Sequence, residues 1–323
     1  MNFRTQVELP EKETEIRHSE QILLFGSCFA ENIGNLLKEN KFRCDVNPFG
    51  VLYNPLSIVC ALNQILERKE YREEDLFFSG GLWHSWMHHS DFSASSSEEC
   101  LERINSRLRK ASEELVTADW LVMTWGTSYV YMHEDMQMVV GNCHKQPDKM
   151  FRRSMQNTSV FVEECLGVLK KCREVNPNLK VLFTVSPIRH VKDGLHENQV
   201  SKSILLQAVD ILISMSHTLS LSSPSSCISY FPSYEIMLDE LRDYRFYAED
   251  MVHPSQVAVD YIWQRFVDTY MTVETQNEMR ALHQLWRDRH HRMLHPESPE
   301  AQQFAAHIKT RLQELQPRYP WIK

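Results

Sequence analysis

Gln21-Ile22-Leu23-Leu24-Phe25-Gly26-Ser27-Cys28-Phe29-Ala30 is the stretch that decides the fold of this 323-residue chain. Its first five residues are an apolar run typical of a buried β-strand, and Gly26 ends the run. Apolar residues then recur at positions 29, 33, 36 and 37, on one face of a helix. The pattern predicts a strand-to-helix turn at Ser27, beside free backbone N–H groups and the positive end of a helix.

Ser27 has two interpretations at such a turn. As a nucleophile, its exposed hydroxyl would have backbone donors nearby for the oxyanion of an acyl-transfer transition state. As a helix N-cap, it would only accept a hydrogen bond from the first amides of the helix, which is a common use of serine. This segment by itself favours the cap.

A second segment, Asp250-Met251-Val252-His253-Pro254, supplies what a serine nucleophile needs. Proline is favoured at the first position of a helix, and residues 255–270 carry a helical apolar face. A carboxylate three residues before a histidine can accept from one ring nitrogen while the other nitrogen faces a substrate. Ser27, His253 and Asp250 would then form an acyl-transfer triad. Otherwise Asp250 or Ser255 caps the helix, and His253 is a surface residue.

Short apolar segments alternate with helical patterns along the main part of the chain. The strand candidates are 22–25, 42–46, 120–124, 179–185 and 227–231, and the helical patterns lie near 29–40, 55–69, 97–117, 158–174, 198–216 and 255–270. This alternation predicts an α/β fold with a mainly parallel five-stranded sheet that helices cover on both faces.

Every distinctive polar or Gly/Pro motif follows one of these strands. The motifs are Ser27, Asn47-Pro48-Phe49-Gly50, Gly126-Thr127-Ser128, Ser186-Pro187-Ile188-Arg189-His190 and, beyond a connecting loop, Asp250 with His253. In a parallel sheet the active site forms beyond the carboxyl ends of the strands, so the topology places Ser27 and His253 on one rim. Turn residues follow strands in any case, which lowers the weight of this pattern.

Residues 271–323 differ in character from the main domain, residues 1–270. Helical patterns lie at 277–290 and 299–314. A local basic cluster contains Arg287, Arg289, His290, His291 and Arg292. A solvated helix face accounts for this cluster best, and we interpret the segment as a C-terminal helical extension of unknown purpose.

Composition excludes several classes of protein. A net charge of -8 and the lack of a long basic run argue against nucleic-acid binding, and no Walker-type or Gly-x-Gly-x-x-Gly loop is present for a nucleotide. No apolar run approaches the roughly 18 residues of a membrane helix, and the first ten residues lack the apolar core of a secretory signal. The eight cysteines are scattered without a Cys-x-x-Cys pair, which is typical of reduced thiols. We therefore expect a cytoplasmic protein.

Residues 83–92 gather aromatic rings and histidines between the second and third strands. His84 and His88 are four apart, so on a helix they could share a metal ion. No third ligand accompanies them at a familiar spacing, and we interpret the stretch as a lid or a substrate-contacting loop. We predict that the protein needs no metal and no organic cofactor.

In one-letter code residues 26–30 read GSCFA. The chain thus resembles the GSCFA family, which is named after this motif and is a group of bacterial proteins similar to SGNH/GDSL hydrolases. The resemblance covers about residues 20–270. Other matching motifs are Glu31-Asn32-Ile33-Gly34, Asn47-Pro48-Phe49-Gly50, Tyr53-Asn54-Pro55-Leu56, Trp83-His84-Ser85, Asn142-Cys143-His144-Lys145, Thr184-Val185-Ser186-Pro187, Arg189-His190, Asn198-Gln199, Ser201-Lys202, 230–235 and 243–255.

The resemblance implies the three-layer α/β/α sandwich of SGNH hydrolases and a role for several residues. Ser27 matches the nucleophile, Gly50 the oxyanion glycine, and Asp250 with His253 the Asp-x-x-His pair. His84, Arg189, His190 and Gly126 are further candidates for contact with the oxyanion or the substrate.

The sequence motif after the third strand, called the third block in SGNH hydrolases, differs in this chain. They have Gly-x-Asn after the third strand, whereas this chain has Gly126-Thr127-Ser128. The missing asparagine donates to the oxyanion, and the loss of one such donor costs on the order of 3 kcal/mol of transition-state stabilisation. Ser128, or Asn54 from the neighbouring loop, could replace it.

The leading interpretation is a serine acyl-ester hydrolase, in which His253, oriented by Asp250, deprotonates Ser27. Related folds act on acylated carbohydrate, so the resemblance implies a carbohydrate or cell-envelope precursor as substrate. An acyltransferase with the same triad is an alternative, because an alcohol can attack the same intermediate as water. A non-catalytic carbohydrate-binding protein is the other alternative, and the missing asparagine supports it.

Overall fold

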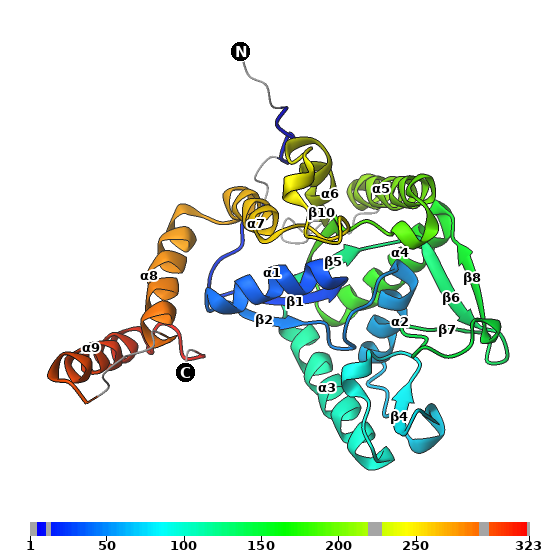
Figure 1. The fold of residues 1–323 in the computed structure, drawn as a ribbon, viewed down its shortest axis with the longest axis horizontal. Helices are drawn as coiled ribbons and strands as arrows, with labels where there is room; N and C mark the ends of the chain where they lie inside the picture. The colour runs from blue at the N-terminus through cyan, green and yellow to red at the C-terminus, as the bar shows by residue number, and fades with distance from the viewer. Residues whose placement is uncertain (1–4, 11–13, 219–227, 291–296, 322–323) are drawn as a thin grey trace.

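The computed structural model describes residues 5–10, 14–218, 228–290 and 297–321. At its centre lies a five-stranded sheet in the order β10-β9-β5-β1-β2, with every pair of neighbours parallel (Figure 1). Its strands are β1 (Gln21–Gly26), β2 (Arg43–Val46), β5 (Trp120–Trp125), β9 (Lys180–Val185) and β10 (Ile228–Phe231). The five predicted strands are confirmed, and Cys227, the expected start of the last one, lies outside the described residues.

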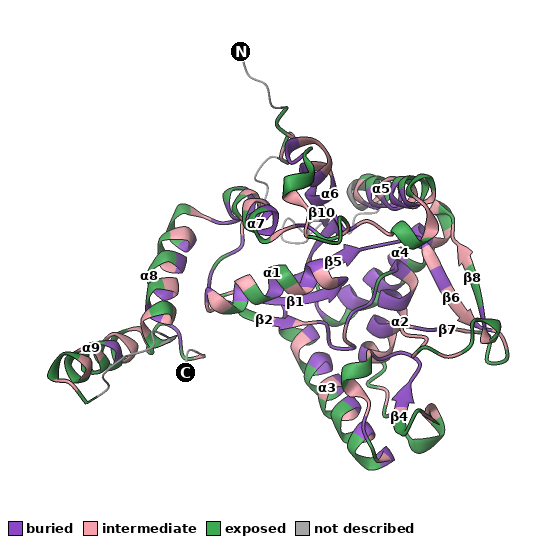
Figure 2. Cartoon of the chain, viewed as in Figure 1, coloured by how far each residue is buried: buried purple, intermediate pink, exposed green. Residues whose placement is uncertain are grey.

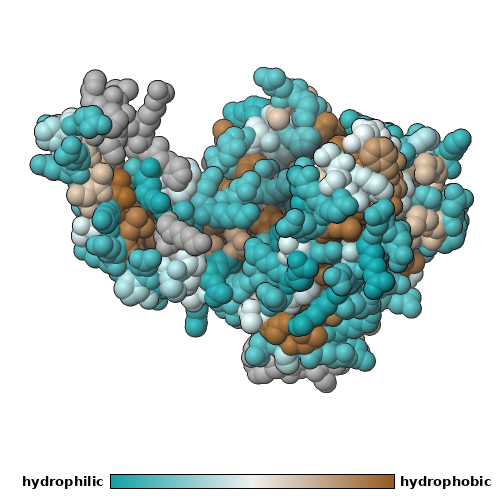
Figure 3. Space-filling view, turned by 90° about the horizontal axis from the view of Figure 1, so that it is seen from below, coloured by the Kyte–Doolittle hydropathy of each residue, from teal (hydrophilic) through white to brown (hydrophobic). Residues whose placement is uncertain are grey.

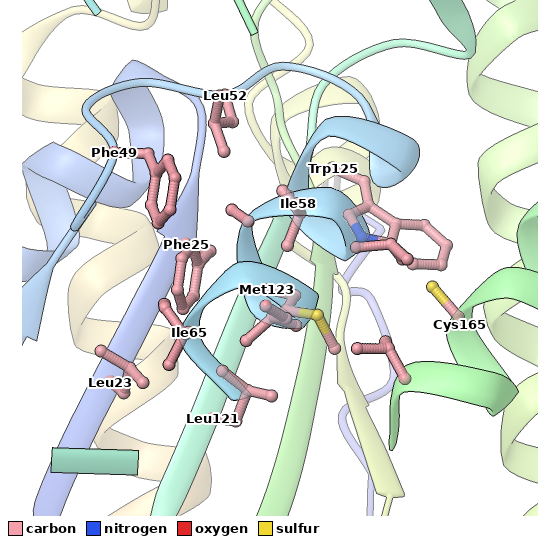
Figure 4. Packing of buried hydrophobic residues seen from close by; sticks show 14 of the residues in the cluster. Leu23, Phe25, Phe49, Leu52, Ile58, Ile65, Leu121, Met123, Trp125 and Cys165 are labelled. Carbon is pink, nitrogen blue, oxygen red and sulfur yellow. The ribbon is translucent and has the colours of Figure 1, made fainter. Parts of the chain in front are cut away.

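The central strands are buried on both faces because their side chains alternate between two layers of helices. Leu23 and Phe25 of β1 pack with one layer, whereas Ile22 and Leu24 pack with the other. Figure 4 shows the first face, where side chains of β1 and β5 meet Ile58 of α2. The first layer contains α2 (Pro55–Leu66), α3 (Ser97–Thr117), α4 (Thr158–Val175) and α5 (Leu195–Thr218), and the second contains α1 (Cys28–Glu39) and α7 (Gln256–Tyr270). The fold is thus the expected three-layer α/β/α sandwich, with the buried residues concentrated at the sheet (Figure 2).

Two small antiparallel sheets accompany the main one, and the sequence interpretation missed both. A hairpin joins β3 (Leu76–Ser79) to β4 (Leu82–Ser85), so the prediction of a loop is wrong for residues 83–85. Gly80 and Gly81 form its two-residue turn with φ of +58° and +82°, values that glycine adopts without strain. The second small sheet, in the order β7-β6-β8, contains β6 (Tyr129–His133), β7 (Met138–Val139) and β8 (Phe151–Met155).

Short helical segments connect the larger elements. They are η1 (Glu73–Asp75), η2 (Ser90–Phe92), η3 (Asp148–Met150), η4 (Val191–Asp193), α6 (Ser233–Glu235), η5 (Ile236–Glu240) and η6 (Tyr244–Phe246).

The C-terminal part consists of α8 (Val273–His290) and α9 (Pro299–Leu315), as predicted. Trp321 anchors it to the main sandwich, because its indole Nε1 donates to the carbonyl oxygen of Lys41 at 2.8 Å. Tyr319 is buried, and its ring centroid lies 5.0 Å from that of His18. Of the basic cluster, Arg287 and Arg289 lie on α8, whereas His291 and Arg292 lie outside the described residues.

The structure also allows the expectations about membrane helices and reduced cysteines to be examined. Figure 3 shows a mainly hydrophilic face on which hydrophobic residues form separate patches. Among the described helices, none has both the length and the apolar character to span a bilayer. The seven cysteines within the described residues are free thiols.

The strand order fixes where a ligand site can form. From β1 the chain passes to β2 on one side, and β5 then pairs with β1 on the other, so the order reverses at the β1–β5 pair. Ligands of open α/β sheets bind beyond the carboxyl ends of the strands at such a reversal. Gly26 and Thr124 are register partners there. A Cβ atom on Gly26, whose φ is +147°, would lie 2.3 Å from the Thr124 carbonyl oxygen, so this position requires glycine.

Candidate active site

Ser27 follows β1 directly and is the N-cap of α1. Its Oγ accepts a hydrogen bond of 3.3 Å from the amide of Phe29, so it forms the capping contact that the sequence predicts. The residue is only 1% exposed, whereas the nucleophile interpretation expected an exposed hydroxyl. A capping bond of this kind contributes about 1 kcal/mol, so it does not exclude a chemical role.

The loop after β2 wraps around the carboxyl end of β1. Gly26 donates its amide to Oδ1 of Asn47 at 2.9 Å, and its carbonyl accepts from the amide of Leu52 at 3.0 Å. Gly50 has a φ of +76°, and a Cβ atom on it would lie 2.2 Å from the Cβ of His89. The amide of Gly50, the expected oxyanion donor, donates instead to the carbonyl of Asn47 at 2.8 Å.

The two residues considered as replacements for the missing asparagine, Asn54 and Ser128, both bind to helices. Asn54 is the N-cap of α2, where its Oδ1 accepts from the amide of Ser57 at 2.9 Å. Ser128 is fully buried, and its amide and hydroxyl both donate to Oγ of Ser201 on α5, at 2.8 and 3.0 Å. The Ser128 hydroxyl is therefore committed to α5, whereas the NH₂ group of Asn54 makes no hydrogen bond with the described residues and remains available as a donor.

The loop after β5 is bound to the loop after β2 and lies against His190. The amides of Gly126 and Thr127 both donate to the carbonyl of Tyr53, at 2.8 and 3.0 Å. A Cβ atom on Gly126 would lie 2.9 Å from that carbonyl oxygen and 3.2 Å from Nε2 of His190. The rings of His190 and Tyr53 also meet edge to face, with centroids 6.2 Å apart. Glycine at position 126 is thus needed for close approach.

His190 brings a buried ring nitrogen to this rim. Its Nε2 has no hydrogen-bond partner within the described part of the chain, while its backbone amide donates to Oδ1 of Asn198 at 2.9 Å. Burial, followed by the positive charges of Lys202, Arg153 and His253, lowers the pKa of His190 to about 3. The imidazole is therefore neutral near pH 7 and carries one N–H donor.

Lys202 of α5 is a residue of this region to which the sequence interpretation gave no role. Its ammonium group is buried and donates to the carbonyl oxygens of Gly126 and Ser186, both at 2.7 Å, which joins the carboxyl ends of β5 and β9. Burial lowers its pKa to about 7. The signal in the sequence was a lysine at a core position of a helix, one turn from Asn198 and Leu205, which are also buried.

Asp250 and His253 form an ordered pair in a tight turn. Oδ2 of Asp250 lies 2.6 Å from Nδ1 of His253, and Oδ1 accepts from the amides of Val252 (2.9 Å) and His253 (3.0 Å). The His253 amide, then its ring and the Val252 amide lower the pKa of Asp250 to about 2. Ser255 caps α7 through its own Oγ, which accepts from the amide of Ala258. Asp250 therefore binds the ring of His253, and Ser255 is the helix cap.

The turn of His253 is attached to the loop after β9. The amide of Arg189 donates to the carbonyl of Val252 at 3.2 Å, and His253 is close enough to His190 to influence its pKa. The His253 side chain is about half exposed. Among the described residues, however, no hydrogen bond joins Ser27 to His253: the imidazole is held by Asp250, and Oγ of Ser27 accepts from the amide of Phe29.

His84 lies away from this rim in β4. Its Nδ1 pairs with Oγ of Ser93 at 2.7 Å and its Nε2 with the carbonyl of Ser79 at 3.0 Å. His88 is fully buried, stacks on Phe49 with ring centroids 4.4 Å apart, and does not share a helix with His84. No group of three or more His, Cys, Asp or Glu residues in the described ranges is arranged to hold a metal ion.

Comparison with known proteins identifies the family of the chain. The model of the GSCFA family matches residues 21–266, which is most of the chain. A search of curated proteins found no match. Among solved structures, a carbohydrate esterase family 3 from Talaromyces cellulolyticus is similar at a TM-score of 0.38 and 10% identity, over 81% of this chain and 98% of that chain. This likeness is too distant to support a conclusion. On the evidence of the family match, the chain belongs to the GSCFA family.

Proposed function

We propose that the protein is a serine acyl-ester hydrolase with Ser27 as nucleophile, His253 as base and Asp250 as the residue that orients the base. The observation that carries the proposal is the Asp250–His253 pair. Its 2.6 Å hydrogen bond favours the imidazole tautomer with the proton on Nδ1, which leaves Nε2 free to accept a proton. In support, the turn of the pair is bound to the loop after β9 through the Arg189 amide and the Val252 carbonyl, and Ser27 follows β1, a parallel strand of the same sheet.

In this mechanism Nε2 of His253 takes the proton of Ser27 while Oγ attacks the carbonyl carbon of the ester. The alcohol leaves with the proton that His253 returns, and water then attacks the acyl-serine with help from the same base. For this transfer the O–H of Ser27 has to point to His253, while its Oγ can still accept from the amide of Phe29. The exposed edge of the His253 ring gives the imidazole room for this approach.

His190 is the proposed oxyanion donor in place of the missing asparagine. Its Nε2 lies against Gly126, at the end of β5 where the third block of SGNH hydrolases stands. Because its ring is neutral, it can donate from Nε2 without competing with His253 for the proton of Ser27. One preorganised donor of this kind is worth about 3 kcal/mol of transition-state stabilisation.

One observation favours a second function, non-catalytic carbohydrate binding. Ser27 is buried and bonded to Phe29, an arrangement that also suits a site without chemistry. An acyltransferase would use the same three residues and pass the acyl group to a sugar hydroxyl. A carbohydrate or cell-envelope precursor ester is the substrate class that family resemblance suggests for all three functions.

The test is covalent labelling with a fluorophosphonate probe, followed by mass spectrometry of the tryptic peptides. The hydrolase and the transferase both require labelling of Ser27, and its absence in Ser27→Ala. Adding a sugar acceptor to the acyl-enzyme then separates them, since only a transferase yields an acylated sugar in preference to free acid. A protein that stays unlabelled, although folded, would contradict both and support the binding function.

A further inference from the structure

A pocket of about 180 Å³ opens beside the Asp250–His253 turn. Its walls come from the loop after β9, the start of α5, the segment of α6 and η5, and η6 with the residue after it. The volume is below the roughly 300 Å³ at which pockets for drug-sized ligands begin, so the pocket suits one small ring. Arg189, on its wall, binds the carbonyl of Val252 through its backbone amide and thereby connects the pocket to the catalytic turn.

The wall that carries Tyr247 is part of the same turn as His253. The amide of Ala248 donates to the carbonyl of His253, and the amide of Ser255 donates to the carbonyl of Phe246, both at 2.8 Å. A molecule in the pocket would therefore contact the wall that continues into the turn of His253.

Two amide side chains present donors to the pocket. Oδ1 of Asn198 accepts from the backbone amide of His190, and Oε1 of Gln199 accepts from the hydroxyl of Tyr234. The first bond fixes the amide of Asn198, because a backbone N–H can only donate, whereas the Tyr234 hydroxyl can pair with either end of the Gln199 amide. Their NH₂ groups make no hydrogen bond with the described residues, so they are left for the oxygen atoms of a ligand.

Arg189 is the only charged residue among the described residues that line the pocket. Its guanidinium carbon lies 4.0 Å from the ring centroid of Tyr247 and 5.5 Å from that of Tyr244. Stacking uses the face of the guanidinium and leaves the N–H groups of its edge for a carboxylate. Arg189 forms no ion pair with the described acidic residues, and its neighbour Asp250 is already committed to His253. A positive group without an acidic partner indicates a site for an anion.

We propose that this pocket binds a sugar ring that bears a carboxylate, the non-reacting part of the ester substrate, and that Arg189 recognises the carboxylate. The inference rests on the proposed function for the role of the pocket in catalysis. The tyrosine rings would cover the C–H face of the sugar, while Asn198 and Gln199 donate to its hydroxyl oxygens. The donors select an anionic sugar over a neutral one, because a neutral ring leaves the guanidinium without a partner.

Isothermal titration of the Ser27→Ala protein with D-glucuronate, D-glucose and inorganic phosphate tests the proposal without turnover. We expect D-glucuronate to bind at least about tenfold more tightly than D-glucose, the ratio that one charge-assisted contact provides. We also expect phosphate to bind more weakly than D-glucuronate, because it lacks the ring. Equal affinities for the two sugars, or phosphate binding as tight as that of D-glucuronate, would overturn the proposal.

Arg189→Gln should remove the preference for D-glucuronate, and Arg189→Lys should restore it only in part, because lysine cannot pair bidentately with a carboxylate. Arg245→Gln is the matched control, since Arg245 lies between the two tyrosines in the chain but its side chain is 75% exposed. The proposal fails if Arg189→Gln and Arg245→Gln bind D-glucuronate equally well.

The outcomes for the pocket and for the proposed function can be told apart. If wild-type protein hydrolyses no ester yet binds D-glucuronate through Arg189, the proposed hydrolase function is wrong and the pocket remains a ligand site. If the protein is an active esterase but shows no preference for the anionic sugar, the proposal for the pocket is wrong and the proposed hydrolase function stands.

Discussion

Nε2 of His190 lies 3.2 Å from the position that a Cβ atom would take on Gly126, so the imidazole fills the space that any larger residue there would need. The two residues come from the ends of adjacent strands, β5 and β9. Their contact puts a neutral imidazole beside Gly126, two residues before the position at which the asparagine is missing.

His190→Ala should lower kcat for p-nitrophenyl acetate by about 10² to 10³-fold, because the oxyanion loses a donor. His190→Gln should retain a larger part of the activity, since its amide can donate in the same region. Because the pKa of His190 is about 3, neither variant should move the acid limb of the pH–rate profile above pH 5. Complete loss in both variants would instead identify His190 as the base.

Ser27→Ala should abolish esterase turnover, whereas Cys28→Ala should retain most of it. Cys28 is the rival nucleophile because it is the next residue and a thiol, and its Sγ lies 3.8 Å from the hydroxyl of Tyr53. Turnover that survives in Ser27→Ala and disappears in Cys28→Ala would identify Cys28 as the nucleophile.

The effect of Ser27→Ala on helix capping, and thus on stability, has to be separated from its effect on turnover. Ser27→Ala should also lower the free energy of unfolding by about 1 kcal/mol. Ser96→Ala provides the control, because Ser96 caps α3 through its Oγ, which accepts from the amide of Glu99 at 3.2 Å. Urea unfolding should show a similar destabilisation for the two variants, while only Ser27→Ala loses turnover.

His253→Ala should nearly abolish turnover, and Asp250→Asn should reduce it by up to about 10⁴-fold, because the amide no longer selects the tautomer with the proton on Nδ1. The double variant should be little worse than His253→Ala, since the two residues act as a unit. The pKa of Asp250 is about 2, so the carboxylate stays ionised throughout the assay range and cannot cause the acid limb of the profile. Strictly additive losses in kcat/KM would show that the pair does not work together.

Lys202→Met should flatten the dependence of stability on pH between about pH 7 and 10.5. In the folded protein the pKa of Lys202 is about 7, below its ordinary value of 10.5. Within that window the unfolded chain holds the proton and the folded chain does not, so this group makes stability rise with pH, by at most about 1.4 kcal/mol per unit. Urea unfolding of both proteins at several pH values measures the difference in slope. Identical slopes would show that Lys202 keeps its proton when folded.

The fold was largely predictable because the main sheet obeys a simple rule. Buried parallel strands are continuous apolar runs, and 21–26 and 120–125 are both of this kind. The small strands escaped prediction because they are short and only partly buried: the apolar run of β3 ends at Phe78, and β8 carries Arg152 and Arg153 within it. The Gly80-Gly81 pair was the one local signal of the β3–β4 hairpin.

The candidate site was less predictable than the fold. The pairing of Asp250 with His253 follows from a three-residue spacing, which is local information. The position of His190 against Gly126 and the engagement of Ser128 by Ser201 depend instead on contacts between distant segments. Side-chain direction at the end of a strand is set by those contacts, and a single sequence does not contain it.

The hydrogen bond between Trp321 and Lys41 joins residues that are 280 positions apart, and this separation has a consequence for the order of folding. The five strands of the central sheet are complete once residue 231 has been synthesised. Contacts between distant residues form slowly, and domains fold as the chain emerges, so the sheet can assemble before α8 and α9 exist. The anchoring of the C-terminal helices then waits for residues 319–321, which makes it a late event in the biosynthesis of the molecule.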